Sequence, residues 1–513
     1  MARYGPRALA GVIAIERRRP AVAESWVTLA AGEWGERTAR GGVSLVRERG
    51  ERILAGSLAG GLNLFDGDFA YEVPPVRGGG TADRVNGDGR NTSVLGAVRL
   101  AGRRSVAELR ADYLDFDRGL PGSVVQPTTD ARQAEHRLAA GLSTRASIGS
   151  LDWRADVDAS DRAVRYTDPA PPASPPYDDS VRVRQLLATM EVSRSRNAAH
   201  LSLGTEGRWL EVRASTLTAA APTNEQVLSA WLRASAEPRL GPTRPTVRAG
   251  ARVDHADYGG VYWSPSVGVS LPVSAATLQV SWAMAFAPPA LADQFFQPGI
   301  LAQPNPDLQP ERVRNDWQLQ ISSKPLRIGD ATASGAVSLF RADIDGMILW
   351  FPNFRFVWSP DNYDVRRRGV EASAAVNLPV AGVSLTGNVS DVAVEYRGPV
   401  LSGQVAYRPR YTAHGAFSAS TLGFRTTLRY RYIGERRSIA GSDLNTLPAF
   451  GVADLQIVRR VAKSRASVDL ALGVDDLFDR AGAMLVDYPS PGRVWRLTLS
   501  VRGRGPSASS PTP

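Results

Sequence analysis

The chain has no cysteine and only four histidines among its 513 residues. Without cysteine it cannot form a disulfide framework, a thiolate metal site or a cysteine nucleophile. The histidines lie far apart and form no HExxH motif; they are His136, His200, His255 and His414. Serine-hydrolase (GxSxG) and phosphate-loop motifs are missing as well. The sequence therefore predicts no metal site, no catalytic residues and no cofactor, and a protein that is not an enzyme.

Long apolar runs are also missing. A membrane-spanning helix needs about 18 consecutive apolar residues, and the nearest approach, residues 8–15, ends at Glu16. This excludes a helical membrane protein.

Lysine is scarce, because only Lys324 and Lys463 contribute to the 61 basic residues and arginine supplies the rest. The formal net charge of +10 has two explanations. It could reflect an anionic partner such as nucleic acid or anionic lipid, or it could reflect genome composition. The charges mostly alternate with apolar residues, and dense basic runs occur only at Arg17–Arg19 and Arg366–Arg368. We expect no nucleic-acid partner.

Strict alternation of apolar and polar residues is the strongest pattern in the chain. It runs through residues 246–254, 277–284, 425–433 and 495–502. In the third of these, Leu428 and Tyr430 share one face while Arg429 and Arg431 share the other. Alternation is typical of β-strands, because successive side chains point to opposite faces of a sheet. With no comparably long helical stripe, the chain is predicted to be all-β.

Two architectures fit such strands. In a soluble sandwich the apolar faces form a shared core, whereas in a transmembrane barrel they meet lipid and the polar faces line the lumen. Short turns, such as Leu100–Arg104 and Pro272–Ala275, alternate here with long Gly- and Pro-rich stretches. The long stretches are residues 72–92, 166–180, 287–312, 350–364 and 480–492. This asymmetry favours a large antiparallel transmembrane β-barrel.

Several segments resemble TonB-dependent outer-membrane receptors, and they occur in the order found in that family. The similar residues are Tyr4 and Gly5 before a Gly-Val-Ile stretch; Arg252-Val253-Asp254; Asn305, Pro306, Asp307, Pro310 and Glu311 after an Ala-Pro loop; Gly369 and Glu371; Leu477 and Phe478; and Pro491, Gly492 and Arg493. We interpret these as structural motifs. In Asn305–Glu311, for example, the prolines fix φ and block helix, so the segment is predicted to lead from an outer loop into a strand.

The resemblance implies a 22-stranded barrel around a globular plug. We expect residues 1–19 to be a remnant of the plug's last strand, residues 20–502 the barrel and residues 503–513 a polar C-terminal tail. The barrel segment allows about 22 residues for each strand with its connection, which would also suit 20 or 24 strands. Most of the plug, the signal peptide and the TonB-contacting segment are not in this sequence. A wrong start codon, a truncated gene and a plug encoded elsewhere would each explain this.

Two acidic patterns could suggest catalysis or metal binding, but we interpret both as structural turns. Asp475 and Asp476 are predicted to belong to a turn at the end of a strand and not to an acid–base pair. Asn86-Gly87-Asp88-Gly89 invites a calcium-loop interpretation, but that register would require oxygen ligands at Arg84 and Leu95. We predict a tight turn there.

Ligand candidates are the aromatic residues and arginine of the long loops. They are Trp350, Phe351, Phe354, Arg355, Phe356, Trp358 and Tyr363, together with Phe295 and Phe296. Flat aromatic surface with an arginine could hold a planar anionic chelate or a corrinoid. The alternative is an aromatic girdle whose exposed ends touch lipid A. A further hypothesis is that lumen-facing Arg429 and Arg431 form ion pairs with a plug.

The resemblance implies a monomeric barrel in the outer membrane of a Gram-negative bacterium, in contact with lipid and lipopolysaccharide. It would take up a small molecule or metal chelate of the ferric siderophore or cobalamin class, with the TonB complex acting only if a plug is supplied. Two alternatives remain open. One is a plugless passive pore or a non-functional truncated receptor, and the other is a soluble or surface-bound polyanion-binding β-protein.

Overall fold

The computed structural model describes residue 20 and residues 22–171, 175–257, 260–299, 302–353, 355, 357–398, 401–439, 446–462, 466–480 and 482–504. The predicted plug remnant 1–19, with Tyr4 and Gly5, lies outside these residues, as does the tail beyond Arg504.

The wall of the molecule is one antiparallel sheet. Its first strands are β1 (Glu24–Gly32), β2 (Arg37–Arg49), β3 (Arg52–Phe65), β6 (Gly89–Ala101), β7 (Ser105–Gly119), β10 (Arg132–Ile148), β11 (Leu151–Asp168), β12 (Tyr177–Arg196), β13 (Ala199–Ala214), β14 (Asn224–Ala236) and β15 (Thr246–Ala256). It continues through β16 (Gly260–Val273), β17 (Ala276–Ala287), β18 (Glu311–Ser323), β20 (Ala331–Pro352), β21 (Trp358–Leu378), β22 (Val383–Tyr396), β23 (Tyr411–Thr421), β24 (Phe424–Ile433), β27 (Phe450–Ala462), β28 (Ala466–Asp475) and β29 (Val494–Arg504).

The remaining elements are short and lie in the connections. They are β4 (Phe69–Glu72) with β5 (Thr81–Arg84), β8 (Gly122–Ser123) with β9 (Gln126–Pro127), β25 (Arg436–Arg437) with β26 (Thr446–Leu447), β19 (Leu326–Ile328), the α-helix α1 (Leu291–Phe295) and the 3₁₀ helices η1 (Pro75–Arg77) and η2 (Val380–Gly382). None of the helices in the described ranges has the length and hydropathy needed to cross a membrane.

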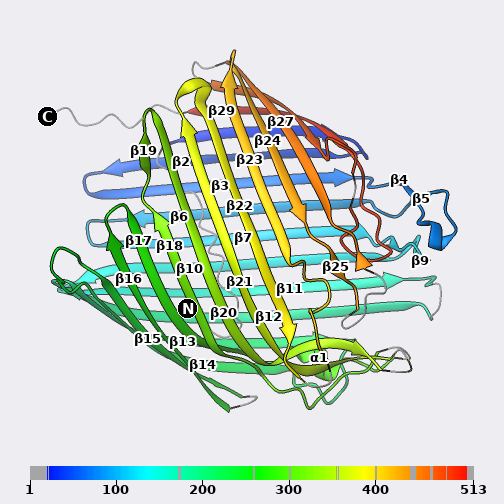
Figure 1. The fold of residues 1–513 in the computed structure, drawn as a ribbon, viewed down its shortest axis with the longest axis horizontal. Helices are drawn as coiled ribbons and strands as arrows, with labels where there is room; N and C mark the ends of the chain where they lie inside the picture. The colour runs from blue at the N-terminus through cyan, green and yellow to red at the C-terminus, as the bar shows by residue number, and fades with distance from the viewer. Residues whose placement is uncertain are drawn as a thin grey trace.

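The sheet closes on itself. Each wall strand pairs with the next along the chain, and β1 pairs with β29 through contacts such as Thr28 opposite Ser500. The main sheet has 23 strands, of which short β19 only extends a turn, so the barrel has 22. The predicted all-β fold and strand number are confirmed. Figure 1 shows the early strands crossing behind the later ones around a common lumen.

The two ends of the barrel differ. Most of the short connections, such as residues 102–104 and 274–275, lie at the end that also holds the C-terminal end of β29, although the nine-residue connection 237–245 lies there too. The longest connections gather at the other end, together with the short β1–β2 turn at residues 33–36. In Figure 1 the long-loop end is on the right, where β4, β5, β9 and β25 lie. Two of the predicted long stretches are shorter than expected, because strands extend into them: β11 and β12 occupy nearly half of 166–180, and β20 and β21 occupy most of 350–364.

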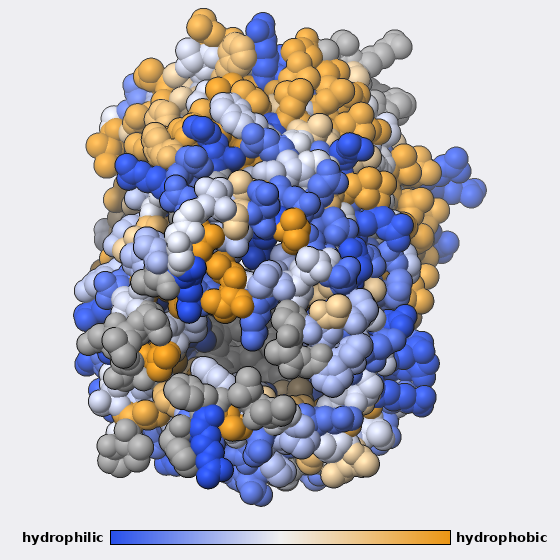
Figure 2. Space-filling view, turned by 90° about the vertical axis from the view of Figure 1, so that its right-hand side faces the viewer, coloured by the Kyte–Doolittle hydropathy of each residue, from blue (hydrophilic) through white to orange (hydrophobic). Residues whose placement is uncertain are grey.

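The outward face is apolar and the inward face polar, as the alternation predicts. On β10, Leu142 lies opposite Leu109 and Val157, and all three are exposed on the outside of the barrel. The next residue, Ser143, points inward and donates a hydrogen bond of 2.6 Å to Asp156. Figure 2 shows the long-loop end, where most of the residues bordering a hollow are hydrophilic and hydrophobic residues gather along the upper edge.

Inward-facing charges are paired across neighbouring strands. Arg252 is fully buried and donates hydrogen bonds of 2.8 Å to both Asp254 and Glu206. Its guanidinium also lies 5.3 Å from the Trp231 ring centroid, and Ser229 donates to Asp254 at 2.6 Å. The Arg252–Asp254 pair belongs to a predicted motif, and these contacts join three strands of the wall, β13, β14 and β15.

Because one face of the wall meets lipid and the other lines the lumen, substitution by arginine should affect stability differently on the two faces. We expect Leu142→Arg to lower the free energy of unfolding in lipid vesicles by about 2–4 kcal/mol, because arginine is placed in hydrocarbon. Ser143→Arg, one residue along, places the same charge in the lumen beside Asp156 and is expected to have little effect. Urea unfolding followed by gel mobility measures both. Equal destabilisation by the two variants would contradict the assignment of the faces.

Candidate functional site: the mouth of the barrel

A cavity of about 600 Å³ opens in the lumen wall at the long-loop end. Closure of the sheet creates it, because the β1–β2 turn and β3 come from the start of the chain while β24, β27, the β28–β29 connection and β29 come from its end. Its volume is typical of small-molecule sites, which are about 300–1,000 Å³. The apolar part of its lining consists of Trp34, Phe65, Phe450 and Met484, with aliphatic residues between them.

Ion pairs between lining residues form the polar part of this cavity. Arg496 donates to Glu36 at 2.7 Å and lies 3.4 Å from Asp475. Arg431, which the sequence placed on the lumen face, lies 3.8 Å from Asp454. Arginine therefore faces carboxylate on both sides of the cavity. Such a lining can bind a polar solute through either sign of charge, with aromatic surface beside it.

The β28–β29 connection forms one side of the cavity, and two predicted motifs hold it in place. The Asp476 amide donates to Asp454 at 3.1 Å, and the Leu477 amide donates to the Ala453 carbonyl at 2.7 Å. Asp479 accepts a hydrogen bond from the Arg493 amide at 2.8 Å. Phe478 is exposed, whereas Pro491 and Gly492 line the cavity itself. Asp475 and Asp476 are thus part of a turn at the end of a strand, as predicted.

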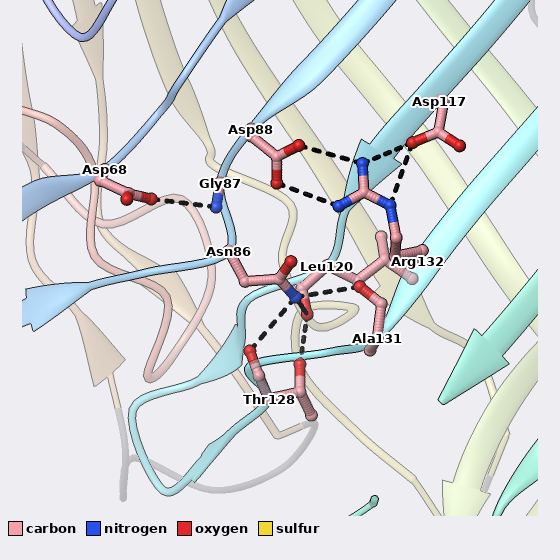
Figure 3. A network of polar contacts seen from close by, with 9 residues as sticks. All are labelled: Asp68, Asn86, Gly87, Asp88, Asp117, Leu120, Thr128, Ala131 and Arg132. Atoms are coloured by element: carbon pink, nitrogen blue, oxygen red, sulfur yellow. Dashed lines mark hydrogen bonds and ion pairs between the residues drawn. The ribbon is translucent and has the colours of Figure 1, made fainter. Parts of the chain in front are cut away.

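The Asn86–Gly89 segment joins two long connections (Figure 3). The Asn86 side-chain amide donates to the carbonyls of Leu120, Thr128 and Ala131, at 2.9 Å to Ala131. The Gly87 backbone crosses that of Gly67 so closely that a Cβ at Gly87 would lie 2.3 Å from the Gly67 carbonyl oxygen. The segment is therefore a close-packed crossing, in line with the predicted tight turn.

Arg132 completes the network. Its guanidinium donates to both carboxylate oxygens of Asp88, at 3.1 and 3.0 Å, and also to Asp117. The carboxylate of Asp88 is thereby used for loop packing. Across the described ranges, no group of three or more His, Asp or Glu side chains lies close enough to hold a metal ion.

The predicted aromatic residues separate into two groups. Trp350 packs against Phe296 with ring centroids 5.5 Å apart and donates to Asp293 at 3.2 Å. These contacts attach α1 to β20. Phe295, next to Phe296, carries the carbonyl that accepts from the Thr218 amide at 2.8 Å.

The second group is Phe351 and Tyr363, whose ring centroids are 5.9 Å apart. Tyr363 also contacts Tyr396, which the sequence prediction missed, in an edge-on arrangement at 5.9 Å. Alternation along β21 places Tyr363 on the same face as buried Val365, which is the lumen face. Trp358 and Arg355 are exposed at the tip of this hairpin, and Phe354 and Phe356 lie outside the described residues.

The segment Asn305–Glu311 connects α1 to β18 and fastens it to the β20–β21 hairpin. The Asn305 side chain donates to the Pro360 carbonyl at 3.1 Å and accepts from the Asp307 amide at 3.1 Å. Glu311 accepts from the Ile348 amide at 2.7 Å. Pro306 offers its carbonyl to Gln294, and Pro310 directly precedes the strand.

Gly369 and Glu371 lie within β21. A Cβ at Gly369 would lie 2.5 Å from the Asp391 carbonyl oxygen, so the strands approach closely there. Glu371 is exposed on the lumen face, opposite Ser338 and Ser390.

Sequence reasoning missed the cavity-lining aromatics Trp34, Phe65 and Phe450. Phe65 ends a strand and Phe450 begins one, each next to a long connection, whereas Trp34 lies in the short turn between β1 and β2. Their positions at strand ends and in a turn are the one signal that could have found them. Their convergence depends on β1 pairing with β29, which no local pattern reveals.

The burial of Asp293 predicts that the stability of its loop depends on pH. Desolvation raises the pKa of Asp293 above its ordinary value, although the Trp350 hydrogen bond partly offsets this. The folded loop therefore binds the proton more tightly than the unfolded chain, so its stability falls as pH rises through the raised pKa. We expect Asp293→Asn to slow hydrogen exchange in residues 288–299 at pH 7 and to have no effect near pH 3, since about 3.9 is the ordinary value. The same exchange rates for both proteins at pH 7 would contradict this.

Close packing around Gly492 predicts that a larger residue there would loosen the β28–β29 connection. An added Cβ would lie 2.1 Å from Asp479 Oδ1, so Gly492→Ala must move the carboxylate that accepts from Arg493. We expect faster tryptic cleavage after Arg480, by about fivefold for the loss of roughly 1 kcal/mol. Gly398→Ala is the control, because a Cβ there meets nothing within 4 Å. Unchanged cleavage of the Gly492 variant would show that the carboxylate does not hold the loop.

Comparisons with known proteins agree with this fold. The family described as "TonB dependent receptor-like, beta-barrel" matches residues 60–477. The siderophore receptor PirA from Acinetobacter baumannii is similar with a TM-score of 0.76 and 16% identity, over 98% of this chain and 83% of that one. The copper transporter OprC is similar with a TM-score of 0.77 and 17% identity, over 97% and 84%.

A third solved structure is a variant of the ferric enterobactin receptor from Pseudomonas aeruginosa in complex with enterobactin. Its TM-score is 0.75 at 17% identity, over 98% of this chain and 84% of that one. No curated protein sequence gives a significant match. The closed 22-stranded barrel and the order of the family motifs agree with the family match over most of the chain. This chain therefore belongs to the TonB-dependent receptor family, and the part of that family that it matches is the β-barrel.

Proposed function

We propose that this barrel is the passage of an outer-membrane receptor that takes up a scarce solute of the ferric siderophore or cobalamin class with energy delivered through TonB. The observation that carries the proposal is the cavity at the mouth. It combines a volume of about 600 Å³ with aromatic and arginine side chains on a polar lumen wall. Similar folds in two siderophore receptors and a copper transporter support a metal-containing solute.

The proposed ligand surface has two parts. The first is the cavity, where Trp34, Phe65 and Phe450 offer flat surface and Arg431 and Arg496 offer charge. The second is the pair Phe351 and Tyr363, together with Tyr396, nearer the tips of the long loops. Phe295, Phe296 and Trp350 are engaged in holding α1, and we assign them to positioning the loop.

The proposed setting is the outer membrane of a Gram-negative bacterium, with the barrel as a monomer in contact with lipid and lipopolysaccharide. Energised uptake requires a plug and a TonB-contacting segment in the lumen, and the solute is released toward the short-turn end. The protein makes and breaks no covalent bond in this process.

The aromatic side chains of the cavity are expected to contribute to the affinity for the solute that is taken up. In cells that depend on this receptor for a ferric chelate, we expect Trp34→Ala to raise the half-saturating concentration about fivefold, from the loss of roughly 1 kcal/mol of stacking. Trp263→Ala is the matched control, because Trp263 is exposed on the outward face and should leave uptake unchanged. The measurement is initial uptake of radiolabelled iron chelate with and without TonB.

Saturable, TonB-dependent uptake that weakens only in the Trp34 variant supports the proposal. Uptake that rises linearly with concentration and persists without TonB would contradict it and indicate a passive pore. Large conductance of the purified protein in planar bilayers would point the same way. Recovery of the protein in the aqueous fraction without detergent would instead favour the polyanion-binding alternative.

A further inference from the structure

A second cavity, of about 400 Å³, lies in the lumen wall of β13–β17 and shares no residue with the mouth cavity. We call it the lower cavity. It is near the short-turn end, because its lining includes Thr246, the first residue of β15 after the connection 237–245. Strand register places one row of its lining across all five strands, namely Ser202, Arg233, Gly250, Ser266 and Ala283. Alternation puts this row on the same face as buried Arg252, which is the lumen face.

Short side chains make the wall hollow at this level. Gly250 and Gly268 face the lumen on β15 and β16 without a side chain, and the neighbouring side chain of Ser266 is short. Toward the long-loop end, the same face carries the large buried side chains of Trp231 and Arg252. The lower cavity therefore begins directly on the short-turn side of the Arg252 cluster.

The polar lining of the lower cavity is rich in hydrogen-bond donors. Its basic side chains are those of His200, Arg233 and Arg248. Its hydroxyl side chains are those of Ser202, Ser235, Thr246, Ser266, Ser270 and Ser281. No Asp or Glu of the described ranges lines it, whereas Glu36 and Asp475 line the mouth cavity. The two arginines therefore make the lower cavity positively charged.

Several of these donors have no acceptor within the described part of the chain. Ser202 is only 1% exposed, and its hydroxyl has no hydrogen-bond partner. Arg233, directly opposite Ser202, donates through Nη2 to Glu191 at 2.6 Å, but its buried Nε has no acceptor. Arg248 has no carboxylate within ion-pair distance there. Buried donors without an acceptor are costly, so a ligand that supplies oxygen acceptors is favoured at this position.

The lining favours a hydrophilic ligand over a flat aromatic one. Trp282 is the one aromatic residue in it, and alternation turns the ring of Trp282 outward, beside Trp317. An acidic side chain from another segment would pair with Arg248 but would leave the six hydroxyl groups unengaged. A small solute with one negative group and several hydroxyls matches both parts of the lining.

We propose that the lower cavity binds a polyhydroxylated carboxylate. The carboxylate lies at Arg248, whose guanidinium donates charge-assisted hydrogen bonds to it. The hydroxyls of the ligand exchange hydrogen bonds with the serines, and its oxygens accept from Ser202 Oγ and Arg233 Nε. The inference rests on the proposed uptake, to which it adds a second binding site on the path from the mouth to the short-turn end and a chemical class for the solute.

The test is isothermal titration calorimetry on the protein purified in detergent. The probes are gluconate, sorbitol, which has a similar hydroxyl chain without the carboxylate, and acetate, which has the carboxylate without the hydroxyls. We expect gluconate to bind at least tenfold more tightly than either of the others. Arg248→Gln should weaken gluconate binding about tenfold, through loss of the charge-assisted hydrogen bonds, and Arg248→Lys should weaken it less.

Arg460→Gln is the matched control. Alternation along β27 places Arg460 on the lumen face with Asp454, and it also lies near the short-turn end. It donates to both carboxylate oxygens of Asp469, at 2.6 and 3.0 Å. Because this arginine already has its own carboxylate, its replacement should leave gluconate binding unchanged. Equal weakening by the two glutamine variants would overturn the proposal in favour of a general effect of lumen charge.

Ser202→Ala separates a binding role from a structural one. The Ser202 hydroxyl has no protein partner to lose, so we expect gluconate binding to weaken about fivefold while the urea midpoint of unfolding does not fall. A lower midpoint with unchanged binding would overturn the assignment of Ser202.

Three further outcomes decide the site. Acetate binding as tightly as gluconate would overturn the proposal in favour of a free-anion site. No gluconate binding by the unmodified protein would overturn it in favour of an acidic segment on Arg248. Loss of gluconate binding in Trp34→Ala would assign the ligand to the mouth cavity instead. Because neither TonB nor uptake is involved, failure here is distinct from failure of the proposed uptake.

Discussion

Backbone pairing around a closed sheet is the constraint on which the rest of the structure depends. Inside a bilayer, N–H and C=O groups have no water to bond, so a spanning sheet must leave no open edge. Here that requires β1 to pair with β29, at opposite ends of the chain. The mouth cavity is a direct result, because the β1–β2 turn and the β28–β29 connection meet only at this seam. Its ion pair between Arg496 and Glu36 likewise joins the last wall strand to the first hairpin.

Alternation then gives the two faces of the wall different chemistry. Outward positions carry aliphatic side chains, while inward positions carry arginine and carboxylate on neighbouring strands, as in Arg110 with Asp158 and Arg208 with Glu225. A buried ion pair contributes little net stability compared with apolar residues, but removing one partner is costly. The Arg252 cluster is the clearest case, since its guanidinium is buried and has two carboxylate partners. Such pairs keep the lumen polar without giving it a large net charge.

The sequence predicted those parts of the fold that depend on local patterns. Residues 246–254, 425–433 and 495–502 lie in strands because period-two alternation is visible within each segment. Strand ends were less predictable: β20 and β21 continue beyond the apolar band, where pairing persists without alternation to mark it. The candidate site was predicted only in part. Phe351 and Tyr363 form a contact. Trp34 and Phe450, however, line one cavity although they lie far apart in sequence, and no pattern within a single segment signals that.

The placement of arginine follows strand register, whichever explanation of the net positive charge holds. On the lumen face, arginines such as Arg110 and Arg208 lie beside carboxylates, and on the outward face Arg366 lies opposite Asp343. Where two arginines lie directly opposite one another, as Arg182 with Arg213 and Arg341 with Arg368, each has a carboxylate partner close by. Strand register thus limits the local charge of the wall although the chain as a whole carries a net charge of +10.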